Sequence, residues 1–442
     1  MKAIMRDKEE LKSSGIEWIG EIPQHWHTEN IKYHFDVIAG ATPDSKNPEY
    51  WDGDITWVTP ADYRTEDKYV KCGKRSLSLA GYQACSASLT PKGSIIFSKR
   101  APIGTVALST TELCTNQGCL ACVPKASVNS TYYYYVMSIA TEEFELKGSG
   151  TTFKEISANN FLNTKLPCLG CEEQQVIANY LDDRCSKIDA IIAEAKASIE
   201  EYKELKQAVI YEAVTKGLDK NAKMKDSGIE WLGSIPAQWN LVKTNRIIDN
   251  TQNGLTRRDL DKSDGQIVLK LKNINAEGEI DYSDTNRIQL TNDEIEKYRL
   301  HNGDLLFVRV NGSRDLVGKC AIFEEKDEAI AYNDHIIRVT LNDYCIPEYV
   351  KWYLLCDSGK SEIALKINTA AGQFTISGEG LRAIYMPLPS LNEQREIVEF
   401  LNNKTKKIDF IINEKQSLIE DLEAYKKSLI YEVVTGKRKV VA

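Results

Sequence analysis

The stretch SGIEWIGEIPQHW at residues 14–26 occurs a second time, almost unchanged, as SGIEWLGSIPAQW at residues 227–239. A chain of 442 residues is too long for one ordinary hydrophobic core, so two or three domains are expected. A repeated phrase of this length, with two tryptophans and a proline at fixed places, indicates that the chain consists of two related halves.

Two further pairs of segments recur in the same order as the opening phrase. EEQQVIANYLDDRCSKIDAII at 172–192 is matched by NEQREIVEFLNNKTKKIDFII at 392–412, and VIYEAVTKG at 209–217 is matched by LIYEVVTGK at 429–437. Between these ends the two halves share little. Matched ends predict one task performed twice, such as docking to a symmetric partner, and diverged middles predict different tasks on one scaffold. Duplication with random drift is the alternative, but drift would not spare the ends selectively.

The matched segments continue into two long helical patterns that neither Pro nor Gly interrupts. One set of positions in each copy is spaced alternately by four and three residues over four heptads, which favours a coiled coil over helices packed on separate domains. At 1.5 Å per residue, roughly 45 residues form a rod of about 65–70 Å. The seam positions are Leu181, Cys185, Ile188, Ile192, Ala195, Ile199, Tyr202, Lys206, Val209 and Ala213 in the first copy, and Leu401, Thr405, Ile408, Ile412, Lys415, Ile419, Leu422, Lys426, Leu429 and Val433 in the second.

These patterns predict an α+β fold in which two similar domains, each a mixed sheet with short helices, are separated by two long antiparallel coiled-coil helices. The predicted boundaries are 1–170 for the first domain, 171–217 for the central helix, 218–390 for the second domain and 391–437 for the C-terminal helix.

The repeated phrase follows the first long helix, but no copy follows the second one, because the given sequence ends there. The copy at residues 14–26 can fill that place. We therefore expect a cyclic arrangement with a pseudo-twofold axis. In it, residues 14–26 lie beside 431–437, as residues 227–239 lie beside 211–217. Trp18, Ile22, Pro23 and Trp26 are then expected to be packing and docking residues rather than base contacts.

Short β-rich runs and turns dominate the diverged middles. Val, Ile, Thr and aromatic residues bounded by Gly, Asp and Pro predict strands, for example DITWVT at 54–59, GSIIFS at 93–98 and GDLLFVRV at 303–310. Short helices are expected at 131–144 and 347–357. The four consecutive tyrosines of the first helix suggest base stacking, but a helix packed on its own sheet is the favoured interpretation.

Basic and amide side chains gather at the predicted strand ends and loops of both middles. Arg, Lys, Asn and Gln form hydrogen bonds with base edges in the major groove, and Lys and Arg also bind phosphates. A single charged loop is weak evidence, whereas recurrence at corresponding places with different identities is a stronger signal. The candidate DNA-binding residues are Lys99, Arg100, Asn116, Gln117 and Lys154 in the first half, and Arg257, Arg258, Lys270, Lys272, Asn273, Arg309, Asn311, Arg314 and Gln373 in the second.

Catalytic motifs are incomplete in this sequence. NPEY at 47–50 lacks the second proline of an adenine methyltransferase motif, and no glycine-rich cofactor loop precedes it. GSRDLVGK at 312–319 has one residue too many between its glycines for a phosphate loop, and Cys320 stands where Ser or Thr would bind magnesium. These departures favour a chain that binds a partner over one that catalyses a reaction.

Two Cys-x-x-Cys pairs, Cys119/Cys122 and Cys168/Cys171, offer the four ligands that a structural zinc needs. Cys119 and Cys122 fall in a predicted strand, where residues three apart face opposite sides. The matching positions of the second half are aliphatic, so we interpret these cysteines as small hydrophobic residues. The five histidines have no metal or catalytic spacing, and no metal site is predicted.

The bulk composition narrows the class of protein. The net charge of −8 shows no general affinity for nucleic acid, so such binding needs local basic patches or a partner. An odd number of cysteines, 11, in a long chain argues against a disulfide framework. The N-terminal MKAIMRDKEELKSS lacks a signal-peptide core, and apolar runs fall short of the ~20 residues of a membrane helix. A cytoplasmic protein without membrane contact is expected.

With these motifs in view, the chain resembles the specificity (S) subunits of type I restriction–modification systems over nearly its full length. The stretches that carry the resemblance are SGIEWIGEIPQHW, GATPDSKNPEYWDGDITWVTPADY, FSKRAPIGTVAL, TNQG, GSGTTFKEIS and LPCLGCEEQQVIANYLD. The resemblance implies that the two middles are target recognition domains, each recognising one half of a bipartite, asymmetric site in double-stranded DNA.

The resemblance also implies partners and cofactors. The long helices would set the spacer between the half-sites and dock two modification subunits, which perform methyl transfer with S-adenosylmethionine. ATP- and Mg-dependent translocation and cleavage would belong to a separate restriction subunit. This chain would hold no cofactor and no catalytic activity of its own. A self-contained DNA methyltransferase or nuclease and a coiled-coil protein adaptor stay open as alternatives.

Overall fold

The structure, a computed structural model, describes residues 1–441 except 101, 151–153, 258–263, 276–277 and 371. Contacts within the chain divide it into two compact units. Unit 1 comprises Met1–Lys196 with Ser417–Ala442, and unit 2 comprises Ala197–Gln416. Each unit therefore combines a globular part with portions of both long helices, whereas the sequence patterns predict four consecutive parts. Among the described residues, no helix is both long and apolar enough to cross a membrane.

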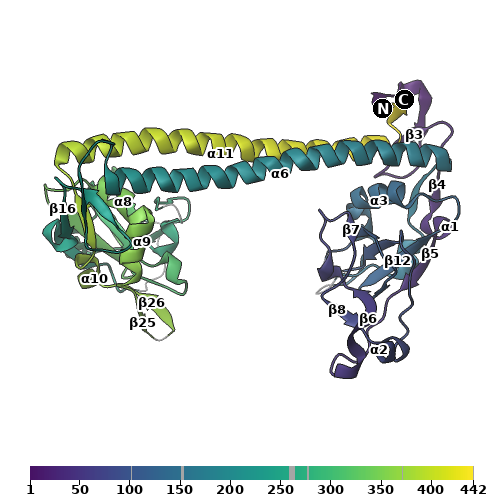
Figure 1. Ribbon diagram of the computed structural model, residues 1–442, viewed down its shortest axis with the longest axis horizontal. Helices are drawn as coiled ribbons and strands as arrows, with labels where there is room; N and C mark the ends of the chain where they lie inside the picture. The colour runs from purple at the N-terminus through teal and green to yellow at the C-terminus, as the bar shows by residue number, and fades with distance from the viewer. Residues whose placement is uncertain (101, 151–153, 258–263, 276–277, 371, 442) are drawn as a thin grey trace. The chain divides into compact units, whose positions relative to one another are not determined.

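The two long helices are α6 (Cys171–Lys216) and α11 (Leu391–Val434) (Figure 1). Each ends where a glycine adopts a left-handed backbone, with φ of 76° at Gly217 and 75° at Gly436. Such a residue cannot continue a right-handed helix, and glycine adopts this conformation at little cost. This explains why α11 ends three residues before the predicted boundary at 437.

The predicted seam faces the interior of each unit. Ile188 and Ile192 of α6 and Ile419 of α11 are buried in unit 1, and Ile199 and Ile408 are buried in unit 2. The 4/3 spacing in the sequence thus identifies the buried stripe of both helices.

Two of the three seam lysines, Lys206 and Lys426, form matched ion pairs between the helices. In unit 2, Lys206 Nζ lies 2.7 Å from both carboxylate oxygens of Asp409. In unit 1, Lys426 Nζ lies 2.6 and 2.8 Å from those of Asp189. Within unit 1, Lys196 approaches Glu423 at 3.7 Å, so residue numbers rise along α6 as they fall along α11. The helix portions in this unit are therefore antiparallel.

The globular part of unit 1 is built on a mixed sheet with the strand order β5-β12-β9-β10-β7 and a smaller sheet β11-β6-β8, counted over the described residues. Helix α3 packs against β10. The strands are β5 (Phe35–Ala39), β6 (Trp51–Val58), β7 (Tyr69–Val70), β8 (Arg75–Leu77), β9 (Ile95–Ser98), β10 (Val106–Ser109), β11 (Cys114–Thr115) and β12 (Cys119–Pro124), and the helices are α1 (Ile31–His34), α2 (Leu79–Gln83), α3 (Ser130–Ile139), α4 (Thr141–Leu146) and α5 (Ala158–Leu162).

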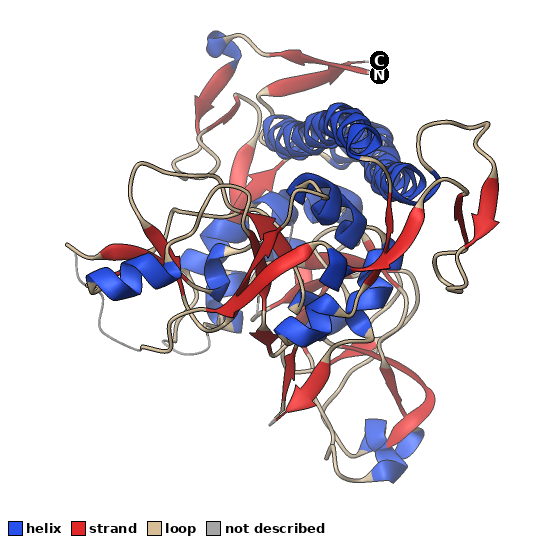
Figure 2. Cartoon of the chain, turned by 90° about the vertical axis from the view of Figure 1, so that its left-hand side faces the viewer, coloured by secondary structure: helices blue, strands red, loops and turns tan. Residues whose placement is uncertain are grey.

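Unit 2 repeats this strand order, with β17-β24-β20-β22 in its larger described sheet and β19-β18-β23 in the smaller one. A third sheet of described residues, β21-β26-β25, corresponds in unit 1 to the antiparallel bridges that Arg100 and Ser149 form with Glu155. Figure 2 shows strands and short helices interspersed. The strands are β17 (Ile248–Asn253), β18 (Gln266–Leu269), β19 (Asn286–Ile288), β20 (Leu305–Val308), β21 (Val310–Asn311), β22 (Cys320–Ile322), β23 (Ile330–Tyr332), β24 (Ile336–Leu341), β25 (Asn368–Ala370) and β26 (Gln373–Thr375), and the helices are α7 (Asn292–Tyr298), α8 (Pro347–Leu355), α9 (Asp357–Ala364) and α10 (Gly378–Arg382).

Paired short strands connect each globular part to its long helix. Strands β4 (His27–Asn30) and β13 (Lys165–Cys168) are antiparallel in unit 1, as are β16 (Asn240–Lys243) and β27 (Tyr385–Leu388) in unit 2. The hairpin-like pairs β2 (Leu11–Ser13) with β3 (Glu21–Pro23) and β14 (Met224–Asp226) with β15 (Ser234–Pro236) hold the repeated phrases.

The first repeated phrase packs against the end of α11, as the cyclic arrangement predicts. Tyr431 Oη and Lys437 Nζ both donate to the carbonyl oxygen of Ile19, at 3.2 and 3.1 Å. In unit 2, Tyr211 Oη donates in the same way to the carbonyl oxygen of Leu232 at 3.4 Å. The two copies of the phrase therefore perform the same structural task.

The last tryptophan of each phrase is a packing residue, as predicted. Trp26 and Trp239 are both 1% exposed. Trp26 Nε1 donates to Glu173 at 3.0 Å, and Trp239 Nε1 donates to Glu393 at 3.1 Å. Burial of the indole supplies stability, and the hydrogen bond satisfies its only polar atom.

One contact at the chain ends is missing from the sequence-based predictions. Strand β1 (Lys2–Met5) pairs antiparallel with β28 (Arg438–Val441), with Lys2 opposite Val441 and Met5 opposite Arg438. Arg6 Nε also donates to the carbonyl oxygen of Gly436 at 3.0 Å. The two marked ends of the chain consequently lie together in Figure 1, and these contacts complete the cycle within unit 1.

The tyrosine run at 132–135 is buried in α3, which confirms packing over base stacking. Tyr132 and Tyr133 are fully buried, and Tyr134 and Tyr135 are at most 7% exposed. Tyr135 Oη donates to Asp182 of α6 at 2.7 Å. These rings therefore attach the globular part of unit 1 to its long helix.

Candidate nucleic-acid interface

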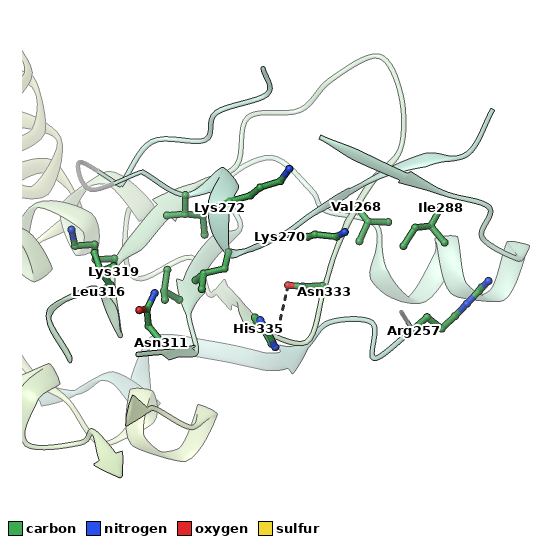
Figure 3. Close-up of a pocket in the computed structure, with 13 residues that line it drawn as sticks. Arg257, Val268, Lys270, Lys272, Ile288, Asn311, Leu316, Lys319, Asn333 and His335 are labelled. Carbon is green, nitrogen blue, oxygen red and sulfur yellow. Dashed lines mark hydrogen bonds between the residues drawn. The ribbon is translucent and has the colours of Figure 1, made fainter. Parts of the chain in front are cut away.

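A cavity of about 770 Å³ opens in unit 2 among strands β18, β19, β20 and β21 and the loops that follow them. Its lining combines an apolar floor with several cationic or amide side chains (Figure 3). The lining residues are Arg257, Val268, Lys270, Leu271, Lys272, Ile274, Ile288, Val308, Asn311, Leu316, Lys319, Asn333 and His335. Four of the sequence-predicted DNA-binding residues, Arg257, Lys270, Lys272 and Asn311, are thus brought to one site.

Lys270 and Lys272 enter the cavity from the tight turn that follows β18. Asn273 shapes that turn: its Oδ1 accepts from the Lys270 N–H at 2.9 Å, and its Nδ2 donates to two carbonyl oxygens at 2.9 and 3.0 Å. Asn273 is 2% exposed. Its amide is fully occupied by the backbone, so this predicted residue positions the lysines. Lys272 Nζ pairs with Asp284 at 2.5 Å.

Arg257 lies at the rim of the cavity and is held by helix α7. Its Nη1 lies 3.0 and 2.8 Å from the two carboxylate oxygens of Glu294. The hydrogen bond from the Thr291 N–H at the start of α7 lowers the pKa of Glu294, and Arg257 lowers it further. This half-buried ion pair fixes the guanidinium, which a phosphate would have to share with the carboxylate. The neighbouring Arg258 lies outside the described residues.

The other predicted residues of unit 2 lie on or beside strand β21. Arg309 Nη1 donates to the carbonyl oxygen of Asp334 at 3.0 Å, and Arg314 Nη2 donates to that of Ala364 at 3.1 Å. Asn311 Oδ1 accepts from the Ser313 N–H at 2.9 Å. Gln373 is exposed on β26, next to the residue that pairs with Asn311.

Unit 1 gathers three of its predicted residues around one loop. Lys99 Nζ lies 2.6 Å and Arg100 Nη1 lies 3.9 Å from the carboxylate of Glu155. Asn116 Oδ1 accepts from the Gly118 N–H at 2.9 Å.

The two remaining predicted residues of unit 1 are exposed. Gln117 is hydrogen-bonded to the Thr42 hydroxyl. Lys154 immediately follows residues that the structure does not describe.

The loops of the two units form equivalent backbone hydrogen bonds. The Lys99 N–H donates to the carbonyl oxygen of Gly118 at 2.8 Å, and the Arg309 N–H donates to that of His335 at 2.8 Å. The carbonyl oxygens of Lys99 and Arg309 in turn accept from Ile156 and Ile376 at 3.1 and 2.9 Å. Equivalent positions thus carry lysine in one unit and arginine in the other.

Three polar residues of the cavity, Lys319, Asn333 and His335, are absent from the sequence-based list. The His335 N–H donates to Asn333 Oδ1 at 3.3 Å. A signal for Asn333 was present, because YNDHIIRVT aligns with TNQGCLACV, in which Asn116 is a predicted residue. Lys319 has no such counterpart in the other half.

Comparisons with known proteins agree with this architecture. The family model described as type I restriction modification DNA specificity domain matches residues 23–201 and 258–421. The specificity subunit of the type I restriction enzyme MjaIX of Methanocaldococcus jannaschii is 40% identical over 171 residues, covering 37% of this chain and 40% of that protein. The EcoKI specificity subunit of Escherichia coli (strain K12) is 25% identical over 292 residues, covering 65% of this chain and 61% of that protein. These matches span less than two thirds of either relative.

Solved structures share the fold at low sequence identity. A chain from a structure of the complex assembly and conformational transition of the type I R-M system has a TM-score of 0.72 and 15% identity, covering 94% of this chain and 99% of that chain. The HsdS subunit from Thermoanaerobacter tengcongensis has a TM-score of 0.54 and 17% identity, covering 94% and 98%.

Proposed function

The chain belongs to the type I restriction modification DNA specificity domain family, and from this premise we propose that it is the DNA-recognising subunit of a type I restriction–modification system. Each globular part recognises one half of a bipartite target in double-stranded DNA. The partners are two modification subunits and a restriction subunit.

The observation that carries this proposal is that the two units carry different side chains at positions with equivalent backbone hydrogen bonds. Lys99 and Arg309 make the same main-chain hydrogen bonds, as do Gly118 and His335. The side chains at these places differ in length, charge distribution and hydrogen-bonding capacity, and such differences select different base edges in the major groove. Two units that share a scaffold but differ at these loops are suited to two different half-sites.

The charge of the chain supports a role within a complex. A net charge of −8 gives the chain as a whole no attraction to DNA. The cationic side chains at the unit 2 cavity supply a local attraction, and the modification subunits supply the remaining phosphate contacts. S-adenosylmethionine belongs to those partners, ATP and Mg belong to the restriction subunit, and this chain carries out no chemistry of its own.

The test is a map of methylated positions across the genome of cells that carry this chain and its modification partner. We expect one bipartite motif with a fixed spacer. Replacing residues 248–384 by those of a related chain should change one half of the motif and leave the other unchanged. If both halves change while the variant remains folded, the two units are not independent readers.

Two outcomes distinguish the alternative functions. Methylation of DNA by the purified chain alone would identify a self-contained methyltransferase. If the chain together with its modification partner binds all DNA sequences equally, the adaptor function is favoured instead.

We also propose that the long helices set the spacer. Inserting four residues into α6 and four into α11 lengthens each helix by about 6 Å, which corresponds to about two base pairs at 3.4 Å each. The methylated motif should then keep both half-sites and gain spacer length. An unchanged spacer in a folded variant would contradict this role.

A further inference from the structure

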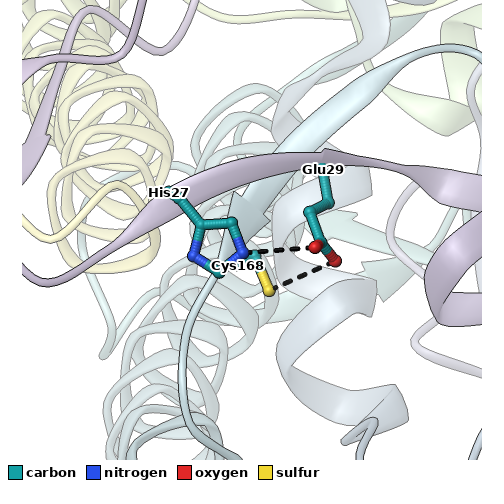
Figure 4. Close-up of side chains that lie close together, drawn as sticks. All are labelled: His27, Glu29 and Cys168. Atoms are coloured by element: carbon teal, nitrogen blue, oxygen red, sulfur yellow. Dashed lines mark hydrogen bonds and ion pairs between the residues drawn. The ribbon is translucent and has the colours of Figure 1, made fainter.

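Three side chains with metal-binding atoms share one face of the β4–β13 strand pair in unit 1 (Figure 4). His27 on β4 lies directly opposite Cys168 on β13, and Glu29 follows His27 by two residues on the same strand. Residues two apart on a strand point to the same face, and directly opposed residues of an antiparallel pair are close neighbours. The backbone register therefore places these three side chains together.

The distances among these groups suit a divalent ion. His27 Nε2 lies 3.2 Å from Glu29 Oε1, and Cys168 Sγ lies 3.6 Å from Glu29 Oε2. Tetrahedral zinc with ordinary bond lengths separates nitrogen from oxygen by about 3.4 Å and sulfur from oxygen by about 3.6 Å. All three ligand atoms lie within 4.8 Å of one another. His27 Nε2 must move a short distance toward Cys168 Sγ to bind the same ion. Because His27 is exposed, its ring can make this movement.

We propose that the His27 imidazole, the Cys168 thiolate and both carboxylate oxygens of Glu29 bind a zinc-class divalent ion. A mixed set of imidazole, carboxylate and thiolate suits zinc better than Mg²⁺ or Ca²⁺, which prefer oxygen ligands alone. The bound ion ties β4 to β13 immediately before α6 begins at Cys171. It therefore stabilises the connection between the globular part of unit 1 and its long helix.

Unit 2 provides an internal comparison on the same scaffold. Strands β16 and β27 pair in the same register, with Asn240 opposite Leu388, and the position matching Glu29 is Val242. Val242 is 5% exposed. The strand pair therefore forms without any of the three ionisable residues, so the fold alone does not require them in unit 1.

The buried His34 lies next to the carboxylate of Glu29. Its Nε2 is 3.9 Å from Glu29 Oε2. The Tyr133 hydroxyl lies 3.1 Å from His34 Nδ1 and donates to the carbonyl oxygen of Pro167 at 3.2 Å.

The experiment titrates the full-length, chelator-treated protein with Co²⁺ and then with Zn²⁺. We expect one ion per chain, a sulfur-to-cobalt charge-transfer absorption band, and its loss when Zn²⁺ displaces Co²⁺. Replacing Cys168 or His27 of unit 1 by the residue at the matching position of unit 2, as Cys168→Leu or His27→Asn, should remove the band. Zn²⁺ affinity should fall by at least about 100-fold, beyond the loss typical of an outer-shell residue.

The matched control is Cys171→Ser, which removes an exposed cysteine three residues away. This variant should keep the band and the rise in melting temperature that Zn²⁺ produces by binding the folded state. Circular dichroism of Cys168→Leu without metal should match the wild type. The proposal is overturned if the wild type shows no band, or if Cys171→Ser abolishes it and Cys168→Leu does not.

Discussion

Gly436, just after the end of α11, packs against the first repeated phrase. The substitution Gly436→Ala tests how closely the two segments pack. An added Cβ at Gly436 would lie 2.4 Å from Cδ and 2.5 Å from Cγ of Pro23, and 3.0 Å from Cη2 of Trp26. Both neighbours are buried residues of the first repeated phrase, so neither can move aside freely. The backbone φ of 75° adds strain for any residue with a side chain.

Two other glycines separate these contributions. Gly15 has φ of 70° and no atom within 4 Å of an added Cβ, whereas Gly217 has φ of 76° and its nearest neighbour, Trp239, lies at 3.0 Å. The left-handed backbone costs about 1–2 kcal/mol for alanine at all three positions. Overpacking a buried contact costs about 1–3 kcal/mol more. We expect losses in the free energy of unfolding of about 1–2 kcal/mol for Gly15→Ala, about 2–5 kcal/mol for Gly436→Ala, and an intermediate value for Gly217→Ala.

Urea denaturation of the three variants measures this order. Tryptophan fluorescence follows unfolding, and Trp26, which lies against Gly436, is one of the seven tryptophans that contribute to it. Far-ultraviolet circular dichroism follows the long helices in the same samples. If Gly436→Ala and Gly15→Ala reduce stability equally, the close packing of the first phrase on the end of α11 is refuted, because only backbone strain would then remain.

Three further experiments test other residues of unit 2. In a double-mutant cycle with Lys206→Ala and Asp409→Ala, urea denaturation should give a coupling of about 0.5–1 kcal/mol, because the pair is partly exposed; a coupling near zero would contradict the ion pair. Asn273→Ala should reduce the free energy of unfolding by about 1–3 kcal/mol, because it leaves buried backbone groups without partners; a neutral result in the same assay would show that the turn does not depend on it. Lys270→Ala should lower the slope of log affinity against log salt by about one unit for DNA binding of the complex, whereas Lys297→Ala on α7 should not; equal slopes would remove Lys270 from the interface.

The long helices and the repeated phrases can be predicted from sequence because their signals are local. An uninterrupted 4/3 spacing identifies the buried stripe at Ile188, Ile192 and Ile199 without knowledge of the partner helix. The repeated phrase predicts its own position, because its second copy stands next to the end of α6. The pairing of β1 with β28 has no such local signal, since short exposed strands are specified mainly by their neighbours.

The roles of individual cations are less predictable, because their partners are distant in sequence. Arg257 pairs with Glu294, and Lys99 pairs with Glu155, and both carboxylates come from elements that sequence spacing does not connect to the cation. A loop cation that is bound internally and one that faces solvent have the same sequence signature. Asn273 shows the same effect for an amide, since only the folded turn reveals that its polar atoms are occupied.

His27 and Cys168 show why histidine and cysteine spacing alone misses a site built across strands. They belong to segments at opposite ends of unit 1's globular part and meet only through the register of β4 with β13. Metal motifs recognisable from sequence place their ligands a few residues apart on one turn or helix. A pair of opposed strands brings ligands together at any separation along the chain. The spacing of histidines and cysteines in the sequence therefore does not reveal such sites.

The two interhelical ion pairs explain why the ends of the repeats match while the middles differ. Lys206 of the first copy contacts Asp409 of the second, and Lys426 of the second contacts Asp189 of the first. Each copy thus supplies the lysine of one pair and the aspartate of the other, so both copies must keep both residues. The loops around Lys99 and Arg309 make their contacts within one unit. They can therefore change independently, and that freedom suits the proposed recognition of two different half-sites.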